Sequence, residues 1–348
     1  MNNYNIDEKI SNSKNNNFTL IKFIAAILVI IAHAYPITIG KGACSYICKL
    51  NNNAFDWGNF AVDIFLFLSG FLIAKSLSKK ESFKNYLKKR VLRIFIPLVI
   101  MLFVSTFLIF PIFYDGDIVT YFTSISPYLY FIKNSFLIVT GKVLNIFSKN
   151  PYPYSVNGAL WTLPVQFICY ILGYILYKLK LNQKMNILNI LVLIIFIFNS
   201  IYMDVIPYII YNSINIGTMF YIGIYLYNIR NKIVFNTKRF LIALILYITF
   251  IYINYNISRI LFLPYLILYV CLYTKPLLNN LFSKVGDLSY TIYLYGFMIQ
   301  QCIVYIFNMN MSPILNIIIA IPVTLIIAYL QVNYIEKRIN KVFYGKKK

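Results

Sequence analysis

The sequence predicts an all-α, polytopic integral membrane protein: a helical bundle of about ten transmembrane helices with both termini in the cytoplasm. Of its 348 residues, 60% are hydrophobic and only 12% are charged, and the mean hydropathy is +0.71. Soluble globular domains carry about twice that share of charged residues. Apolar runs of roughly 20 residues recur along the chain, which is the length that a helix needs to cross about 30 Å of hydrocarbon.

Ten apolar runs have a length that suits a helix, and one long interval does not. Residues 115–157 hold only a short apolar piece, interrupted by Pro127, Lys133 and Gly141, so we expect a non-cytoplasmic loop with an interfacial or re-entrant element there. The chain then divides into a cytoplasmic segment at 1–18, one transmembrane domain at 19–335 and a basic cytoplasmic tail at 336–348. The expected helices cover residues 19–39, 59–78, 94–114, 158–177, 186–202, 207–228, 239–255, 258–274, 288–308 and 314–335.

The net charge of +22 sorts by side of the membrane. With ten helices, 26 of the 32 lysines and arginines lie at cytoplasmic ends. This is the positive-inside asymmetry, which sets the orientation, and an even number of helices returns the C-terminus to the cytoplasm. The basic residues are scattered over several segments and form no single stripe with interleaved aromatics, which argues against nucleic-acid binding.

The N-terminus and the cysteines add two smaller expectations. The first 18 residues are too polar to open a signal peptide, so we expect the first helix to stay attached. Cys44 and Cys48 lie in the first outside loop, where an oxidising compartment allows a disulfide, although a spacing of four makes a small ring. We interpret the other three cysteines, which lie in apolar helices, as buried small hydrophobes, and we predict no metal site.

Polar residues within apolar helices are the candidates for function, because they are costly there and usually face a cavity or a partner. Lys22 and His33 are eleven residues apart, so they share one face of the first helix about 16 Å apart along its axis. His33 is the only histidine, and its side chain suits general-base work at neutral pH. The alternative is a structural histidine that hydrogen-bonds to a neighbouring helix.

The second and third helices carry further candidates. Asp63 and Gly70 share a face, with Ser69 beside them; this face is either a packing seam or part of a substrate pocket. Arg90 and Arg93 share a face as the chain enters the third helix. Two guanidinium groups at a cytoplasmic edge suit phosphate through bidentate hydrogen bonds. Topology alone, or the attraction of anionic lipids, would also produce this run.

Two later segments complete the set. Trp161 lies at the mouth of the fourth expected helix, and Gln166 lies within that helix. The ninth expected helix begins with Ser289, Tyr290 and Tyr293. One tyrosine among 32 means little, but several polar groups on one helix favour a site.

Together these segments resemble the acyltransferase 3 family of integral-membrane O-acyltransferases, which acylate hydroxyls of bacterial surface glycans. The resemblance spans nearly the whole chain. It implies an enzyme of the bacterial cytoplasmic membrane, in which Arg90, Arg93 and Lys22 bind acetyl-CoA at the cytoplasmic face and His33 is the catalytic base. The acceptor would be a surface glycan or a lipid-linked sugar precursor. The motifs are Lys22 with His33, VDIFLFLSGF at 62–71, Arg90 with Arg93, LWTLPVQ at 160–166 and SYTIYL at 289–294.

Two departures from the family pattern matter. Lys22 stands where an arginine is usual, which keeps the charge but loses the bidentate fork. Gln166 stands where a glutamate is usual, which removes a titratable group. Oxyanion or substrate-pocket candidates are Asp63, Ser69, Trp161, Gln166, Ser289, Tyr290 and Tyr293.

Three alternatives remain open at this point. A transporter or flippase of lipid-linked sugars would also be polytopic and basic inside, but we find no internal repeat with broken helices in two halves. A glycan polymerase would want a large outer loop with arginines, and residues 115–157 contain none. A catalytically degenerate relative is suggested by Gln166.

Overall fold

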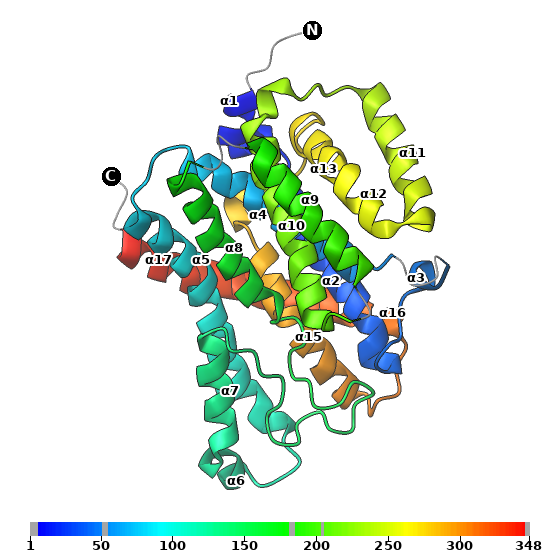
Figure 1. Cartoon of the computed structure of the whole chain (residues 1–348). Helices are drawn as coiled ribbons and strands as arrows, with labels where there is room; N and C mark the ends of the chain where they lie inside the picture. Colours follow the sequence, from blue (N-terminus) through cyan, green and yellow to red (C-terminus); the bar gives the residue numbers. More distant parts are fainter. Residues whose placement is uncertain (1–5, 51–54, 181–184, 203–204, 345–348) are drawn as a thin grey trace.

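The computed structural model describes residues 6–50, 55–180, 185–202 and 205–344, and within these residues every regular element is helical. Each of the ten expected apolar runs coincides with a helix, although one of them is broken in two (Figure 1). The helices are α2 (Phe18–Ile39), α4 (Trp57–Leu77), α5 (Phe83–Phe103), α8 (Thr162–Lys178), α9 (Met185–Ile201), α10 (Tyr208–Asn228), α11 (Thr237–Ile253), α12 (Tyr255–Leu261) with α13 (Leu263–Leu272), α15 (Ser289–Ile306) and α16 (Pro313–Leu330).

Six helical segments of the described chain are long and apolar enough to cross a membrane, which makes this a multi-pass membrane protein. Helices such as α8, with 17 residues, are shorter than the roughly 20 residues that span the hydrocarbon upright. Ten spans, and cytoplasmic termini, therefore stay predictions. The six segments are Phe18–Ile39, Trp57–Leu77, Phe83–Phe113, Tyr208–Asn228, Tyr255–Leu272 and Pro313–Phe343.

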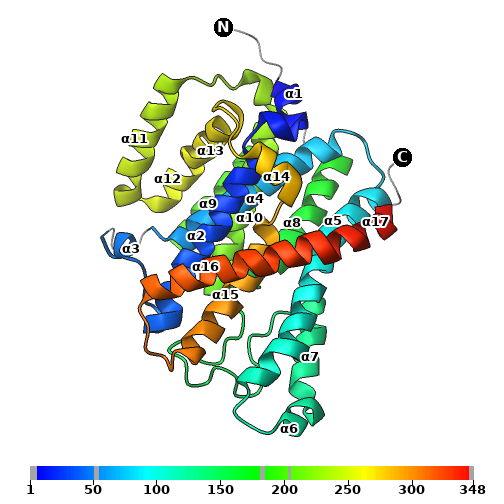
Figure 2. The ribbon, with the colours of Figure 1, turned by 180° about the vertical axis from the view of Figure 1, so that it is seen from behind.

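Two expected helix boundaries were wrong, and one expected helix is interrupted. α5 begins at Phe83, because the Ser82 hydroxyl caps it and the basic residues that follow are good helix formers, so the helix starts before the apolar run. The eighth expected helix breaks at Phe262, just before Pro264. α5 continues through η2 (Val104–Ile109) and η3 (Phe110–Phe113), close to the expected end at residue 114. α16 continues through η6 (Gln331–Glu336) into α17 (Lys337–Tyr344), beyond the expected end at residue 335. Figure 2 shows α16 and α17 as one long rod across the bundle.

The interval 115–157 contains two short helices, α6 (Ile118–Thr123) and α7 (Ile125–Ser135), and then an irregular segment. This segment folds back onto the middle of α15. The amide of Gln301 donates to the carbonyls of Tyr152 and Ser155, both at 2.8 Å, and accepts from Asn150 at 2.8 Å. Irregular backbone is tolerated inside a membrane protein where its polar groups are paired in this way.

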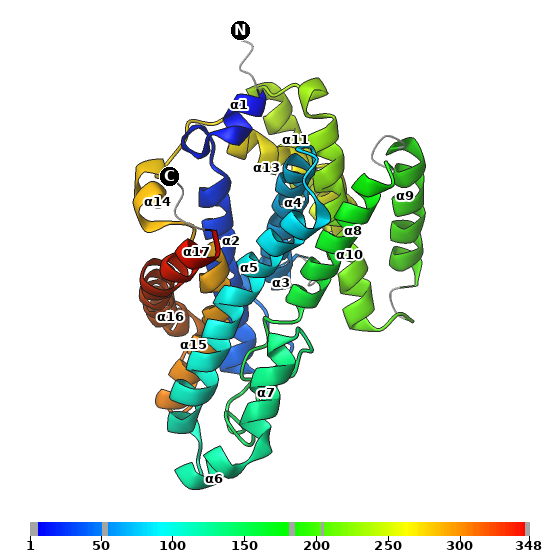
Figure 3. The ribbon, with the colours of Figure 1, turned by 90° about the vertical axis from the view of Figure 1, so that its left-hand side faces the viewer.

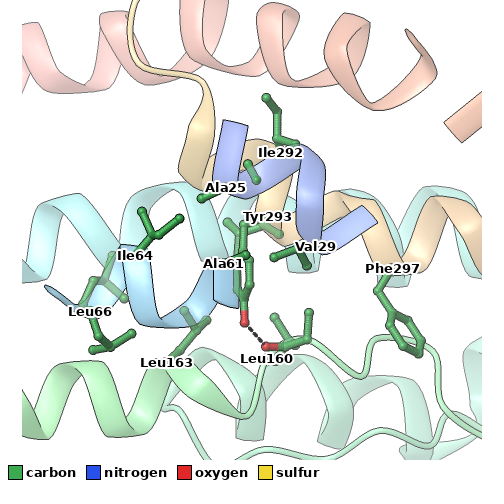
Figure 4. Packing of buried hydrophobic residues seen from close by; sticks show 14 of the residues in the cluster. Ala25, Val29, Ala61, Ile64, Leu66, Leu160, Leu163, Ile292, Tyr293 and Phe297 are labelled. Carbon is green, nitrogen blue, oxygen red and sulfur yellow. Dashed lines mark hydrogen bonds between the residues drawn. The ribbon is translucent and has the colours of Figure 1, made fainter. Parts of the chain in front are cut away.

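The centre of the bundle is the crossing of α4 and α10, where the two backbones touch. A Cβ atom added to Gly70 would lie 1.9 Å from the carbonyl oxygen of Phe220, and one added to Gly223 would lie 2.2 Å from that of Phe67. Small residues allow such close approach between helices in a membrane. α2 packs against both α4 and α15, and Figure 4 shows the apolar side chains that fill the space between these three helices.

The N-terminal segment holds three helix ends together. In α1 (Ile6–Ser11), Asp7 forms an ion pair with Arg230 at 2.5 Å; the Arg230 hydrogen bond holds the pKa of this carboxyl below its ordinary value. Lys75 donates to the carbonyl of Ile10, at 2.8 Å. The ends of α4 and α10 that were expected at the cytoplasm therefore meet around α1, at the top of Figure 1.

Two further short helices are α3 (Tyr46–Leu50) and α14 (Asn279–Val285). Residues 1–5 of the expected N-terminal segment and 345–348 of the expected tail lie outside the described residues.

Candidate active site

Lys22 and His33 of α2 both point toward α15 and the segment that leads into it, as their shared helix face requires. The ammonium group of Lys22 forms an ion pair with Asp287, just before the start of α15. The imidazole of His33 lies edge-on to the ring of Phe297, with 5.1 Å between the ring centroids. Close packing at Gly296, where a Cβ atom would lie 2.8 Å from Ile30, keeps the two helices together.

His33 opens into a cavity of about 450 Å³, which we call the histidine pocket. The imidazole makes no hydrogen bond to any described residue, so a structural histidine bonded to a neighbouring helix is not what the structure contains. The pocket has the size of an ordinary small-molecule site. Its lining residues include His33, Asp56, Asn59, Tyr152, Trp161, Thr162, Tyr208, Tyr293 and Phe297, with the disulfide-bonded Cys44 and Cys48 at its edge.

Several residues of this pocket were not singled out by the sequence. Asp56 caps α4, with its carboxylate accepting from the backbone of Gly58 at 2.8 Å. Burial raises the pKa of the Asp56 carboxyl, and these backbone hydrogen bonds oppose the rise. Asp56 precedes an apolar helix, a pattern that predicts a cap but gives no sign that the cap faces His33. Gly158 lets the irregular segment approach, because a Cβ atom there would lie 2.8 Å from the ring of Phe297.

A narrow middle cavity adjoins the histidine pocket and shares Thr162 and Tyr293 with it. It holds about 30 Å³, room for one or two water molecules. Tyr293 donates to the carbonyl of Ala159 and is 2.6 Å from the Thr162 hydroxyl; Figure 4 shows it reaching from α15 toward Leu160 and Leu163. Gln166, also in the wall, donates to the hydroxyls of Tyr170 at 2.8 Å and Ser69 at 3.3 Å.

A third cavity, of about 330 Å³, lies at the basic end and shares Tyr290 with the middle cavity. Its charged lining residues are Arg93, Asp287 and Glu336, and the nearest atoms of Arg93 and Asp287 are 3.8 Å apart. Burial alone would raise the pKa of the Asp287 carboxyl, but the charges of Lys22 and Arg93 outweigh it and hold the pKa below its ordinary value. Ser289 donates to the same carboxylate, at 2.6 Å.

The two arginines of α5 point to different neighbours. Arg93 is about half exposed in the basic-end cavity. Arg90 instead donates to the Ser76 hydroxyl at 3.2 Å, and its guanidinium lies over the rings of Tyr86 and Tyr170. The structure thus gives Arg93 the more open position and Arg90 a packed one.

Asp63 lies outside all of these cavities. It is fully buried and pairs with Arg259 of α12, whose nearest nitrogen is 3.2 Å away. Tyr255 donates to the same carboxylate, at 3.5 Å. The structure therefore gives Asp63 a partner in the packing of α4 against α12 and places it apart from the substrate-pocket candidates Trp161, Gln166 and Tyr293.

One face of α15 lines all three cavities in turn. Asp287 and Tyr290 line the basic end, Tyr290 and Tyr293 line the middle, and Tyr293 and Phe297 line the histidine pocket. Within α15, Tyr290, Tyr293 and Phe297 are three or four residues apart, so they stand one above another along about 10 Å of helix. The described residues thus contain a row of cavities from the basic residues to His33.

Comparison with known proteins decides the family. The sequence profile described as an acyltransferase domain, that of acyltransferase 3, matches residues 15–331. The chain belongs to the acyltransferase 3 family. The O-acetyl transferase of Shigella phage Sf6 is 28% identical over 355 residues, covering 93% of this chain and 96% of that protein. No solved structure matches the chain.

The geometry also bears on Lys22 and Gln166, the two positions at which this acyltransferase 3 protein departs from the family pattern. Lys22 shares Asp287 with Arg93, so it belongs to the basic end although it lacks an arginine fork. Gln166 makes its two hydrogen bonds as a donor. A glutamate there would accept from the same two hydroxyls, so the position fits either residue.

Proposed function

We propose that this acyltransferase 3 protein transfers an acetyl group from cytoplasmic acetyl-CoA to a hydroxyl of a bacterial surface glycan or its lipid-linked precursor, in the cytoplasmic membrane. The observation that carries the proposal is the position of His33, without a hydrogen-bond partner among the described residues, at one end of a row of cavities. The other end of that row contains Arg93 and, through Asp287, Lys22. The relative from phage Sf6 bears the name O-acetyl transferase, which supports acetyl as the group.

His33 would act as the general base. Its free imidazole nitrogen would accept the proton of the acceptor hydroxyl while that oxygen forms a bond to the acetyl carbonyl carbon. As the carbon–sulfur bond breaks, the imidazolium would return the proton to the departing thiolate. The products are an O-acetyl ester and free CoA, and His33 regains its starting state.

Trp161 is the best-placed donor for the oxyanion of this step. Its indole N–H makes no hydrogen bond to any described residue, and the ring lines the histidine pocket. Tyr293 and Tyr290 already donate their protons to the carbonyls of Ala159 and Ile94, and Ser69 lines none of the three cavities. A preorganised, unengaged donor is what such a step requires.

The basic end would bind the phosphate groups of the donor. Arg93 is half exposed there and can form charge-assisted hydrogen bonds, and Lys22 adds a second positive charge at Asp287. The middle cavity, at about 30 Å³, is too narrow for the thioester arm, so Gln166 and Tyr290 would have to move apart when the donor binds.

Membranes containing the wild type or His33→Ala, supplied with acetyl-¹⁴C-labelled acetyl-CoA and host surface glycan, would test the proposal. We expect the variant to lose roughly 10²–10⁴-fold in the rate of label transfer while remaining folded in the membrane. Ile245→Phe, on an exposed face of α11, is the control and should keep full activity. Full activity of His33→Ala would refute the mechanism, and no labelling by the wild type with several glycans would refute the function.

Family membership favours acyl transfer over a transporter or flippase of lipid-linked sugars. The same assay separates the enzyme from a degenerate relative, because a degenerate relative with Gln166 would bind the donor without transferring its label.

A further inference from the structure

A lateral groove of about 440 Å³ lies between α8, α9 and α10, apart from the row of cavities at α15. α10 forms its floor, and α8 and α9 form its walls. The lining is almost wholly apolar, with Val165, Leu172 and Leu176 on one wall and Val192 and Ile195 on the other. Figure 3 shows α9 at the outer edge of the bundle, beside α10.

Polar contacts near both ends of α9 hold the groove in shape. Asn189 accepts a hydrogen bond from Tyr221 at 2.8 Å, and Asn199 donates to Asn215 at 3.2 Å. Hydrogen bonds of this kind fasten helices to each other in a membrane. The groove stays deep because its floor has a glycine at 217, where an added Cβ atom would meet only the Cys169 sulfur, at 4.0 Å.

Along two helices, α8 and α10, residues at one end of the groove are close in sequence to residues of the histidine pocket. On α8, Val165 of the groove is three residues from Thr162 of the pocket, which is less than one turn. On α10, Ile210 of the groove is two residues from Tyr208 of the pocket, so the two lie at the same level of that helix on different faces. A molecule in the groove therefore has one end at the level of the histidine pocket, and α8 is the helix along which the two spaces adjoin.

The dimensions of the groove suit one hydrocarbon chain. From Val165 to Leu176 it follows eleven residues of helix, about 16 Å, or roughly half the hydrocarbon thickness of a bilayer. The histidine pocket, by contrast, contains Asp56, Asn59 and Tyr152, whose polar groups suit sugar hydroxyls. The two spaces together match an amphipathic molecule with an apolar chain and a saccharide head.

We propose that the acceptor is a lipid-linked saccharide, with its hydrocarbon chain in the groove and its sugar in the histidine pocket. This inference rests on the proposed acetyl transfer and makes it more specific: the sugar is modified while it is attached to its lipid, before release into a water-soluble polymer.

The full-length protein in phospholipid nanodiscs allows a test that needs no turnover. The probe is dodecyl β-maltoside with a diazirine in its chain, and the comparison probe is a phosphatidylglycerol with a diazirine at the same depth. We expect the glycolipid to crosslink the groove faces of α8 and α10 about tenfold more than the outer face of α11, and the phospholipid to show no such preference. Equal labelling of the groove by the phospholipid would make it a site for bulk lipid and overturn the proposal.

Two variants separate occupancy of the groove from loss of fold. Gly217→Phe fills the groove from its floor, and Ile168→Trp fills it from the wall. Both should lose glycolipid crosslinking, whereas Ile194→Phe, 57% exposed on the outer face of α9, should keep it. Retained crosslinking in both groove variants would overturn the proposal.

An acetyl-transfer assay then distinguishes the two levels of inference. With a host saccharide offered as its dodecyl glycoside or its methyl glycoside, the wild type should show a KM about tenfold lower for the dodecyl form, and Gly217→Phe should remove that difference. Transfer to both forms with equal KM would refute the groove proposal but keep the enzyme. Selective crosslinking without transfer to either form would refute the acetyl transfer and leave a glycolipid site.

Discussion

The ammonium group of Lys22 and the carboxylate of Asp287 form an ion pair that joins the first turns of α2 to the segment leading into α15. Arg93 adds a second positive charge on the same carboxylate. The pKa of Asp287 lies below its ordinary value of about 4. The ion pair therefore stabilises the fold fully at pH values above about 4, and this stabilisation is lost as the pH falls through the lowered pKa.

Asp287→Asn should therefore lower the Tm at pH 7 and remove part of the loss of stability that the wild type shows below about pH 4. Thermal unfolding in detergent between pH 3 and pH 7 would measure both effects. Glu8→Gln, at an exposed carboxylate of α1, is the matched control and should follow the wild type. Identical pH profiles for Asp287→Asn and the wild type would contradict the assignment.

The two arginines of α5 should differ when each is replaced by alanine. Arg93→Ala removes a half-exposed cation from the basic end, so the KM for acetyl-CoA should rise roughly tenfold or more with the Tm almost unchanged. Arg90→Ala removes contacts with Tyr86 and Tyr170, so, unlike Arg93→Ala, it should lower the free energy of unfolding by about 1–2 kcal/mol. Steady-state kinetics with thermal unfolding of both variants would check this; a KM effect confined to Arg90→Ala would reverse the roles.

Replacing Gln166 should separate hydrogen bonding from proton transfer. In Gln166→Glu, Ser69 and Tyr170 can donate to the new carboxylate, so we expect the fold and acetyl transfer to persist. In Gln166→Leu, neither bond can form, and an unpaired Tyr170 hydroxyl should cost about 1–3 kcal/mol and lower the activity. Initial rates and Tm values of the two variants would measure this. Wild-type behaviour of the leucine variant would show that these bonds are dispensable.

The contact between α4 and α10 should not tolerate a side chain at Gly70. The added methyl group of Gly70→Ala would lie 1.9 Å from the carbonyl of Phe220, so the helices must separate, at about 1–3 kcal/mol. Gly217→Ala, also a glycine within a helix, has 4.0 Å of space and should be neutral or slightly stabilising. Chemical or thermal unfolding of the two alanine variants would compare them directly. Equal stability of the two would mean that the crossing is not close-packed.

The periodicity of the α-helix correctly predicted which residues of one helix share a face. The eleven-residue spacing placed Lys22 and His33 on one face, and in the structure Lys22 contacts Asp287, just before α15, and His33 contacts Phe297 of α15. The apolar runs located ten helices because the hydrophobic length of a span is a local property. The start of α5 at Phe83 was missed because basic residues extend a helix without adding hydrophobicity.

Partners from distant parts of the chain could not be predicted in this way. Asp63 needed a partner, but Arg259 is 196 residues away along the chain, and no local pattern connects the two. Thr162, Tyr208 and Asp56 reach the histidine pocket from three elements. Their meeting depends on how α4, α8 and α10 cross, which no single segment encodes. Gln301 was visible as a polar residue in an apolar helix, but its role in holding the irregular segment was not.

Because one face of α15 lines all three cavities, the distance from Tyr290 to Phe297 is fixed by a whole number of residues in a continuous helix. Inserting or deleting one residue between them would rotate everything beyond by about 100° and turn one end away from the others. The stretch from Tyr290 to Phe297 can therefore change only by substitution. A longer or shorter acyl donor would have to be accommodated by the size of the side chains on this face of α15, because the spacing of these residues along the helix cannot change.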